Sequence, residues 1–266
     1  MITSRNNEQV KMVTALQKKG RERSARNLFV VEGLKMFLEA PAERIRQVFV
    51  SERFRAGEQW KEYAAAFENC TCTVVADQVF EHMSDTQSPQ GVLCLLEQFH
   101  YAKEDLLGEI PLVMVLEDVR DPGNLGTILR AGEGAGITGV LMTEGCVDIC
   151  NPKVIRSTMG SIYRVPFAVT DDLERDLNWL KKAGVELCAA HLKGKHPYDM
   201  ADYCAPTAFM IGNESRGLTQ EASSLADTLV RIPMLGQVES LNAAMAAGIL
   251  MYEAARQRRG RRGETL

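Results

Sequence analysis

The chain has 266 residues, of which 45% are hydrophobic and 25% are charged, a composition typical of a globular protein with room for two modest domains. Its seven cysteines and four histidines show no disulfide or metal-ligand spacing, and it contains neither an apolar run of transmembrane length nor a signal peptide, so we expect a cytoplasmic protein without a metal. A net charge of −4 excludes a uniformly basic nucleic-acid binder, so any nucleic-acid footprint must be local.

The first hundred residues alternate between helical and extended patterns. Val10, Val13 and Leu16 have helical spacing, and Gly20 fits the end of that helix. The further expected elements are a strand at 28–31, a helix from 34 to 40, a strand at 45–50, a helix at 58–68, and strands at 73–75 and 92–96. This alternation predicts an α/β sandwich over residues 1–100.

A polar segment at residues 101–110 ends before Pro111 and is interpreted as an interdomain linker. A second alternation of strands and helices follows it. The expected strands are 112–116, 139–142, 185–190, 208–211 and 229–232, and the expected helices are 124–135, 173–182 and 241–257. These elements predict a second α/β domain over residues 111–266.

Charge is distributed unevenly along the chain. Residues 1–55 carry twelve Lys/Arg against six Asp/Glu, residues 256–266 carry five Arg against one Glu, and the stretch between them is acidic. A charge run is most often only a solvated surface, but this polarisation places phosphate-attracting charge at both ends. The cluster that we expect to contact nucleic-acid phosphates consists of Lys18, Lys19, Arg21, Arg23 and Arg26.

The first candidate motif follows the strand at 112–116. Asp121-Pro-Gly-Asn124 predicts a turn in which Asn124 is placed to cap the next helix, so a structural role competes with a functional one. Arg130 lies farther along that helix among apolar neighbours. It is either a solvated side chain or projects from a largely buried helix toward a site.

Two further polar segments interrupt apolar stretches. Ile211-Gly-Asn-Glu-Ser-Arg-Gly-Leu218 follows a predicted strand, and its two glycines suit a loop whose backbone approaches a ligand, although most such pairs are simple turns. Ser240-Leu-Asn242 stands at the start of the closing helix, which is rich in small residues. Ser and Asn at such a position commonly cap free backbone N–H groups, and this is the competing structural interpretation.

The three segments, in this order, resemble the three motifs of the SpoU/TrmH-type RNA ribose 2′-O-methyltransferases of the SPOUT superfamily. The resemblance covers residues 111–256 and implies S-adenosyl-L-methionine as the methyl donor. The residues that it implies in catalysis are Asn124, Arg130, Glu214, Ser240 and Asn242. Those that it implies around the donor are Gly212, Ile232, Met234 and Leu241. Ser215 departs from the pattern, because many members have Gly there, and this puts only the loop geometry in doubt.

The resemblance also implies an architecture. It suggests a C-terminal SPOUT α/β domain with a trefoil knot, which general topology rules would reject, and a homodimer whose knotted halves complete each donor site. The segments 3–7 and 29–33 are similar to the N-terminal substrate-binding domain of many such enzymes. That domain is a small α/β/α fold like ribosomal protein L30e, and its presence implies RNA as the partner of the basic cluster.

Methyl transfer to a ribose 2′-hydroxyl needs in-line alignment and a route for the hydroxyl proton. Proposals for the family make the motif arginine the general base, which is demanding because the pKa of a guanidinium lies above about 12. We instead expect Arg130 to hold the target phosphate as a planar fork and to stabilise the developing oxyanion. Asn124, Ser240 and Asn242 would then fix its orientation.

The sequence therefore predicts an S-adenosylmethionine-dependent RNA ribose 2′-O-methyltransferase. Ribosomal RNA is favoured over tRNA because the N-terminal module resembles a ribosomal-protein fold. Two alternatives stay open: a tRNA 2′-O-methyltransferase, and a non-catalytic RNA-binding protein that retains the knotted fold, against which the intact motif residues argue. A Rossmann-type enzyme is not supported, because the glycines at 132–136 lie at a helix end with the wrong spacing.

Overall fold

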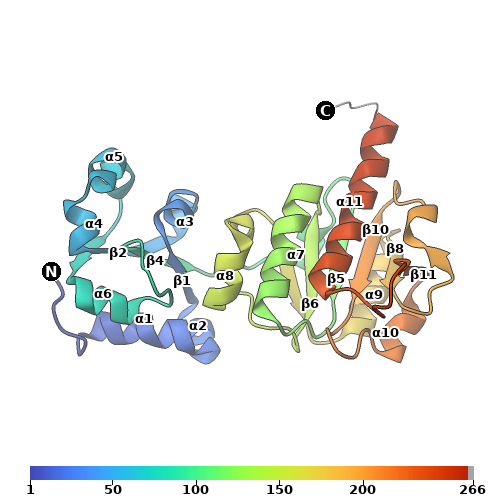
Figure 1. Cartoon of the computed structure of the whole chain (residues 1–266), viewed down its shortest axis with the longest axis horizontal. Coiled ribbons are helices and arrows are strands. Elements are labelled where there is room, and N and C mark those ends of the chain that lie inside the picture. Colours follow the sequence, from blue (N-terminus) through green and yellow to red (C-terminus); the bar gives the residue numbers. More distant parts are fainter. Residues whose placement is uncertain (263–266) are drawn as a thin grey trace. The chain divides into compact units, whose positions relative to one another are not determined.

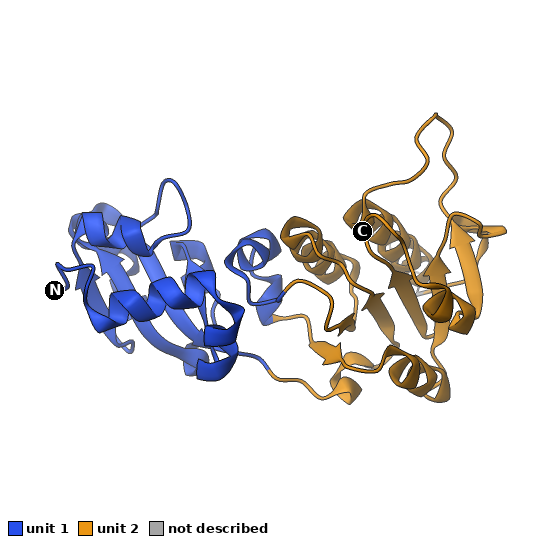
Figure 2. Ribbon diagram, turned by 90° about the horizontal axis from the view of Figure 1, so that it is seen from below, with its two compact units in different colours: residues 1–99, 148–163 blue, residues 100–147, 164–266 orange. Residues whose placement is uncertain are grey.

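The computed structural model of the chain describes residues 1–262 and forms two compact units. Unit 1 contains residues 1–99 and 148–163, and unit 2 contains residues 100–147 and the chain from 164 onward (Figure 2). The predicted domain boundaries did not include the return of 148–163 to unit 1. Residues 263–266, the end of the predicted second domain, lie outside the described residues. No helix within residues 1–262 is long and apolar enough to cross a membrane.

Unit 1 is built on a four-stranded sheet in the order β1-β4-β2-β3. Its strands are β1 (Leu28–Glu32), β2 (Ile45–Ser51), β3 (Cys72–Val75) and β4 (Val92–Glu97). Strand β4 is antiparallel to both β1 and β2, whereas β2 and β3 run parallel. All four strands were predicted from their short runs of apolar and β-branched residues.

Helices cover both faces of this sheet, as the expected α/β/α arrangement requires (Figure 1). Helices α1 (Glu8–Lys18) and α6 (Asp77–Met83) bury Val10, Val13 and Phe80 in one core layer. The helices of the other layer are α3 (Leu34–Leu38), α4 (Glu52–Ala56) and α5 (Glu58–Phe67), with η1 (Ala42–Arg44) beside them. Stacked Phe37 and Phe67 rings, 4.5 Å apart, join α3 to α5.

Two predictions for this unit need correction. The first helix ends at Lys18, next to the expected stop, but Gly20 begins a further helix, α2 (Gly20–Arg26), which was not predicted. Helices α4 and α6 were not predicted, because five and seven residues are too few for a clear helical period.

The segment 148–163 belongs to unit 1 through specific polar contacts. It contains α8 (Pro152–Thr158) and η3 (Ser161–Tyr163). Buried Arg23 donates from Nε to Asp148 Oδ2 at 2.8 Å, and the Tyr163 hydroxyl donates to the Met36 carbonyl oxygen at 2.9 Å. The chain therefore passes between the two units three times.

Unit 2 is built on seven parallel strands in the order β7-β6-β5-β10-β8-β11-β9. The strands are β5 (Leu112–Leu116), β6 (Gly139–Thr143), β7 (Phe167–Thr170), β8 (Glu186–Ala190), β9 (His196–Pro197), β10 (Thr207–Ile211) and β11 (Thr228–Arg231). Every residue of β5 and β10 is buried, as expected for strands covered on both faces.

Helices α7 (Pro122–Ala135) and α11 (Ala243–Arg262) pack against each other in front of this sheet in Figure 1. Helices α9 (Leu173–Lys182) and α10 (Gln220–Leu225) cover the opposite face and contribute Leu177, Leu180 and Ala222 to its core. A short η4 (Tyr198–Met200) follows β9. Every element predicted for this region is present, whereas β7, β9, α8 and α10 were too short to predict.

The segment interpreted as a linker is part of unit 2. Residues 103–106 form the short helix η2, and Leu106 is fully buried in the core beneath β5 and β6. Lys103 also forms a 2.9 Å ion pair with Asp176 of α9. The polar composition of 101–110 concealed this single buried leucine.

The parallel sheet changes its winding direction between β5 and β10. From β5 the chain proceeds to β6 and β7 on one side, whereas β8, β11 and β9 lie on the other side of β10. Ligands of open parallel sheets bind at the carboxyl ends of the strands at such a point. Leu116 is paired with Ile211, so these two carboxyl ends lie side by side. The trefoil knot implied by the resemblance stays a prediction.

Candidate active site

The loop that leads to the Asp121–Asn124 motif begins at the carboxyl end of β5, and the Gly212 motif begins at the carboxyl end of β10. These two strand ends are neighbours in the sheet. The backbone N–H of Glu117 donates to the Ile211 carbonyl oxygen at 2.9 Å, which holds the two exits in register. The loop at 117–121 therefore starts beside the loop at 212–219. Sequence order alone does not give this pairing, since more than ninety residues separate the two loops.

Two side-chain contacts fasten these loops to each other. The carboxylate of Glu117, which is 8% exposed, accepts from the Thr219 backbone N–H at 2.8 Å and from its hydroxyl at 2.7 Å. At the near end, Asn213 Nδ2 donates to the Asp118 carbonyl oxygen at 2.8 Å. Sequence reasoning assigned no role to Glu117, although an acidic residue directly after a buried strand was a signal for one. Its function here is to position the Gly212 loop.

Glu214 lies where the two loops meet. Its Oε1 accepts from the Asp121 backbone N–H and from Asn124 Nδ2, both at 3.0 Å, and its Oε2 accepts from the Arg120 backbone N–H at 3.3 Å. Burial alone would raise the pKa of this carboxyl, but the hydrogen bonds from Asn124 and the two backbone groups outweigh it. The pKa of Glu214 is therefore lowered, and the side chain is a carboxylate at neutral pH.

Asn124 links this carboxylate to the third motif. Asn242 Nδ2 donates to Asn124 Oδ1 at 2.8 Å, while Asn124 Nδ2 donates to Glu214. Asn124 was expected as a possible helix cap, but that role belongs to Asp121, whose side chain accepts from the Asn124 backbone N–H at 2.8 Å. The amide of Asn124 is thus free to join the chain Glu214–Asn124–Asn242, which we call the amide relay.

The hydrogen-bond partners at the two ends of the amide relay fix which way each amide group is turned. Glu214 is an acceptor only, so Asn124 must turn its Nδ2 toward it and leave Oδ1 for the other side. Asn242 accepts through Oδ1 from the N–H groups of Ala244 and Met245 at the start of α11, so its Nδ2 must face Asn124. The same side chain therefore caps α11 and joins the amide relay, so the structural interpretation of Asn242 is confirmed and its catalytic role stays a prediction.

A cavity of about 310 Å³ lies beside the amide relay, between the loops that follow β8, β10 and β11. Residue 212 requires Gly, because a Cβ there would come within 2.1 Å of the Gly217 carbonyl carbon. The predicted donor-binding residues that line this cavity are Gly212, Ile232, Met234 and Leu241, together with Glu214 and Ser240 from the predicted catalytic set. Asn124 and Asn242 lie in the relay instead of the cavity wall.

The structure does not bring Arg130 to this cavity. Its side chain is exposed on α7 and is not part of the cavity lining. The face of α7 that carries Arg130 also carries Gly134, four residues later, where an added Cβ would lie 2.8 Å from the Tyr252 hydroxyl. The expected contacts from Asn124, Ser240 and Asn242 to Arg130 are therefore not formed within this chain.

The basic cluster of unit 1 lies at the end of α1 and along α2. Lys18, Lys19, Arg21 and Arg26 are exposed there, and their role at RNA stays a prediction. Arg23 is only 3% exposed, because its guanidinium donates to Asp148 and to the Leu16 carbonyl oxygen. It must be removed from the expected RNA-binding set, since those donors face the protein interior.

Comparisons with known proteins agree with this division of the chain. The model of the SpoU rRNA Methylase family matches residues 111–252, and that of the MRM3-like substrate binding domain matches residues 7–94. The chain is 29% identical to the 23S rRNA (guanosine(2553)-2′-O)-methyltransferase RlmP of Bacillus subtilis, over 94% of this chain and 97% of that protein.

Two further similarities span nearly the whole chain. It is 34% identical to an uncharacterized tRNA/rRNA methyltransferase of Synechocystis, over 96% of this chain and 93% of that protein. The crystal structure of an AdoMet-bound rRNA methyltransferase from Sinorhizobium meliloti matches with a TM-score of 0.85 and 32% identity, covering 96% of this chain and 97% of that one. The chain belongs to the SpoU rRNA methylase family, and its first unit carries the matching substrate-binding domain.

Proposed function

We propose that the protein transfers a methyl group from S-adenosylmethionine to a ribose 2′-hydroxyl of ribosomal RNA. The observation that carries the proposal is the amide relay, which joins one side chain from each of the three motifs beside a cavity. Family membership supplies the reaction class. The names of the relatives, RlmP above all, support ribosomal RNA over tRNA.

The residues around the cavity fit S-adenosylmethionine. Pockets for small ligands begin at roughly 300 Å³, so about 310 Å³ is sufficient for a donor that is partly exposed. Ile211, Ile232 and Met234 supply apolar walls. The cavity is also lined by carboxylates, Glu214 and Glu239, and by cations, Lys193, Arg216 and Arg231, and these two signs suit a donor that carries both a sulfonium cation and a carboxylate. The backbone of the Gly212 loop presents N–H and carbonyl groups that can hydrogen-bond an adenine edge.

The bound donor supplies an electrophilic methyl group, and the protein's residues supply alignment and charge. The amide relay holds the loop at 212–219 and the start of α11 in one arrangement, which keeps the cavity in shape. Ser240 lines the same cavity, where its hydroxyl can hydrogen-bond a bound ligand. Arg130 holds the RNA phosphate and stabilises the developing 2′-oxyanion, because its planar guanidinium forms paired hydrogen bonds.

Arg130 performs this role in a homodimer, in the site of the second copy. Within one chain it lies outside the cavity, on the face of α7 that also carries Gly134, next to Tyr252 of α11. Met245 and Tyr252 of α11 are 58% and 53% exposed, and they offer apolar surface that a second subunit could cover. An Arg130 fork from the partner would complete the site.

Complementation tests the shared site. Arg130→Ala removes the guanidinium that a subunit supplies to its partner's site. Gly212→Val obstructs the donor cavity of the subunit that carries it, because the added Cβ would clash with the Gly217 backbone. We expect each variant alone to be inactive and a co-expressed mixture to regain activity, because mixed dimers contain one intact site. No recovery from a mixture that sediments as dimers would overturn the shared site, and a monomer at micromolar concentration would overturn the dimer.

The substrate is tested by mapping 2′-O-methylation in cells that lack the gene. We expect one ribosomal RNA position to lose its methyl group and to regain it with the wild-type gene but not with Arg130→Ala. Loss confined to tRNA would contradict ribosomal RNA as substrate. Failure of the purified protein to bind S-adenosylmethionine in calorimetry would contradict the reaction itself.

A further inference from the structure

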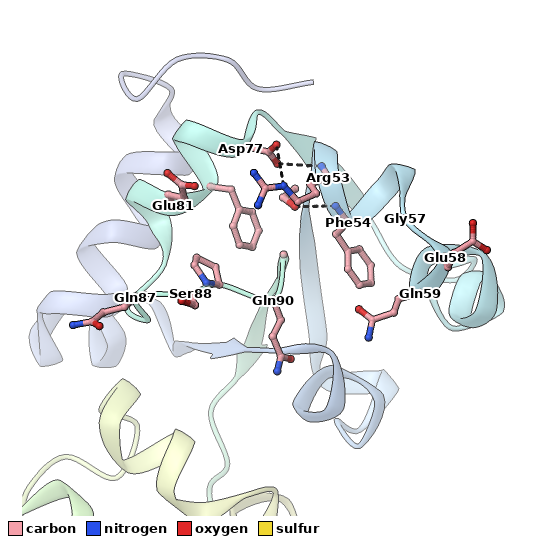
Figure 3. Close-up of a pocket in the computed structure, with 14 residues that line it drawn as sticks. Arg53, Phe54, Gly57, Glu58, Gln59, Asp77, Glu81, Gln87, Ser88 and Gln90 are labelled. Carbon is pink, nitrogen blue, oxygen red and sulfur yellow. Dashed lines mark hydrogen bonds and ion pairs between the residues drawn. The ribbon is translucent and has the colours of Figure 1, made fainter.

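Unit 1 contains a second cavity, apart from the candidate active site. Its volume is about 480 Å³, and it lies where the end of β2, helices α4 and α6, the start of α5 and the loop at 87–91 meet (Figure 3). Every residue that lines it falls within residues 7–94, the part of the chain that matches a substrate-binding domain. None of them has a role in the methyl-transfer site of unit 2.

The floor of this cavity is apolar and firmly held. Phe54 and Phe80, which line it, are 6% and 1% exposed. Gly91 has φ +85°, and a Cβ at this position would lie 2.6 Å from both Ser51 Oγ and Phe54 Cβ. The Ser51 backbone N–H donates to the Gly91 carbonyl oxygen at 2.9 Å, so the loop at 87–91 is fixed against the end of β2. The cavity is therefore part of the fold and does not depend on a loose surface loop.

Arg53 lies at the rim of the cavity beside Asp77 (Figure 3). Asp77 accepts from the Arg53 backbone N–H at 3.0 Å, and its carboxylate lies 3.9 Å from Arg53 Nε. The side chain of Arg53 is nevertheless 83% exposed. A guanidinium that is anchored at its backbone but open to solvent offers a flat surface on which a planar ring can stack.

The charges of the rim argue against a phosphate as the main ligand. Arg53 is the cation among the residues that line the cavity, whereas Glu58, Asp77 and Glu81 are acidic. The remaining polar side chains of the lining are neutral, three amides and two hydroxyls, those of Gln59, Gln87, Gln90, Ser51 and Ser88. An apolar floor with hydrogen-bonding groups at its edge suits a flat, uncharged ring with a polar periphery.

We propose that this cavity binds one unpaired nucleobase of the substrate RNA, separate from the nucleotide that is methylated. Proteins that read single-stranded RNA take splayed bases onto aromatic or guanidinium planes and hydrogen-bond their edges. The exposed plane of Arg53, above the apolar floor of Phe54 and Phe80, provides the first element. The amide of Gln59 provides the second, together with Nε2 of Gln90, whose Oε1 accepts from the Leu34 backbone N–H at 3.2 Å. The proposal rests on the proposed function only in taking RNA as the ligand.

Trp60 is a local reporter for this cavity. Its ring lies 6.3 Å from that of Phe54, centroid to centroid, in an edge-on arrangement. The chain contains two tryptophans, and the other, Trp179, belongs to unit 2. In a full-length Trp179→Phe protein, fluorescence therefore reports on unit 1 alone. S-adenosylhomocysteine at saturating concentration keeps adenine nucleotides out of the cavity of unit 2.

The experiment titrates this protein with the four nucleoside 5′-monophosphates, with ribose 5-phosphate and with inorganic phosphate. We expect saturable fluorescence changes with the nucleotides and none with the two compounds that lack a base. Arg53→Ala should weaken nucleotide binding about tenfold, within the range of roughly 1–3 kcal/mol for stacking of one base. Arg46→Ala is the matched control, because Arg46 pairs with Glu97 outside the cavity.

Each other outcome overturns the base-binding proposal. If ribose 5-phosphate changed the fluorescence as much as the nucleotides do, the cavity would bind the phosphate and not the base. If no nucleotide changed the fluorescence at millimolar concentration, the cavity would not bind nucleobases. If Arg53→Ala bound nucleotides as tightly as the wild type, Arg53 would not be the surface on which the base stacks. S-adenosylmethionine binding and methyl transfer are measured separately on the same protein, so a failure here is distinct from a failure of the proposed function.

Discussion

The two units use partly buried polar contacts in different ways. In unit 1 a charged pair, Arg23 with Asp148, holds a returning chain segment against α1 and α2. In unit 2 two neutral amides, Asn124 and Asn242, connect a carboxylate to the start of a helix. An ion pair attracts over a range of geometries, whereas each amide presents one donor side and one acceptor side. The ion pair therefore holds a chain segment in place, whereas the directional hydrogen bonds of the amides set the positions of the loops around the candidate site.

The largest effect in this comparison is expected at Arg130, the cationic side chain that we assign to the RNA phosphate and the developing oxyanion. Arg130→Ala should lower methyl transfer by about 10²–10³-fold, the usual cost of removing an oxyanion-stabilising donor. Arg130→Lys should also fail, because a point charge cannot replace a planar fork. Single-turnover rates and calorimetry with the donor measure the two quantities separately. Near-normal turnover with lysine, or loss of donor affinity with alanine, would refute the assignment.

A smaller effect, on stability, is expected in unit 1. Arg23→Met leaves Asp148 without its partner, which breaks an ion pair that is buried on one side and 38% exposed on the other. We expect a loss of about 2–3 kcal/mol, below the roughly 3–5 kcal/mol for fully buried pairs. Urea unfolding followed by Trp60 fluorescence measures this loss, with Arg21→Ala as the exposed control. Equal stability of both variants would show that the pair does not hold the segment.

A third prediction concerns the exposed charges of the same helices. Changing Lys18, Lys19, Arg21 and Arg26 to Ala should lower the affinity for ribosomal RNA and flatten its dependence on salt. Each lost phosphate contact removes about 0.7–0.9 units of log–log slope, so four contacts amount to about three units. Filter binding at several salt concentrations gives the slope, and donor affinity serves as the unchanged control. A slope equal to that of the wild type would locate the RNA footprint elsewhere, with the Arg256–Arg261 face of α11 next to be tested.

The smallest effect is a pH dependence at Glu214. Because the pKa of this group is lowered in the folded protein, its carboxylate contributes stability above the ordinary value of 4.5, and this contribution is lost as the pH falls through the folded pKa. The stability difference between the wild type and Glu214→Gln should therefore be largest near neutral pH and shrink on acidification. Unfolding curves at a series of pH values measure it. A difference that grew toward low pH would contradict the sign.

The sequence predicted those parts of the fold in which the local pattern is strong. The buried runs of β5 and β10 and the long helices α7, α9 and α11 were recognisable from period and length. Helices α4, α8 and α10 were not, because five to seven residues give no reliable period and the contacts that stabilise them are distant in the chain. The return of 148–163 to unit 1 depends on Arg23, a residue that looked like one more surface charge.

The candidate site residues were proposed from their motifs, whereas the hydrogen bonds between them came only from the structure. No local pattern shows that Asn124 donates to Glu214, ninety positions later, or that Asp121 takes the capping role. The position of Arg130 outside the cavity was equally invisible, since burial of the neighbouring residues does not tell which way one side chain of a helix projects. Glu117 was overlooked because its partner, Thr219, is close only in space.

The amide relay is tested most directly by comparing Asn124→Asp with Asn124→Ala at saturating donor and RNA. Aspartate has nearly the same shape as asparagine but cannot donate to Glu214 when ionised, and it places a second carboxylate 3.0 Å from the first. If the relay sets the geometry of the site, turnover at neutral pH must fall further with aspartate than with alanine, at unchanged global stability of unit 1. Turnover of the aspartate variant equal to that of the wild type, or higher than that of the alanine variant, would contradict the account.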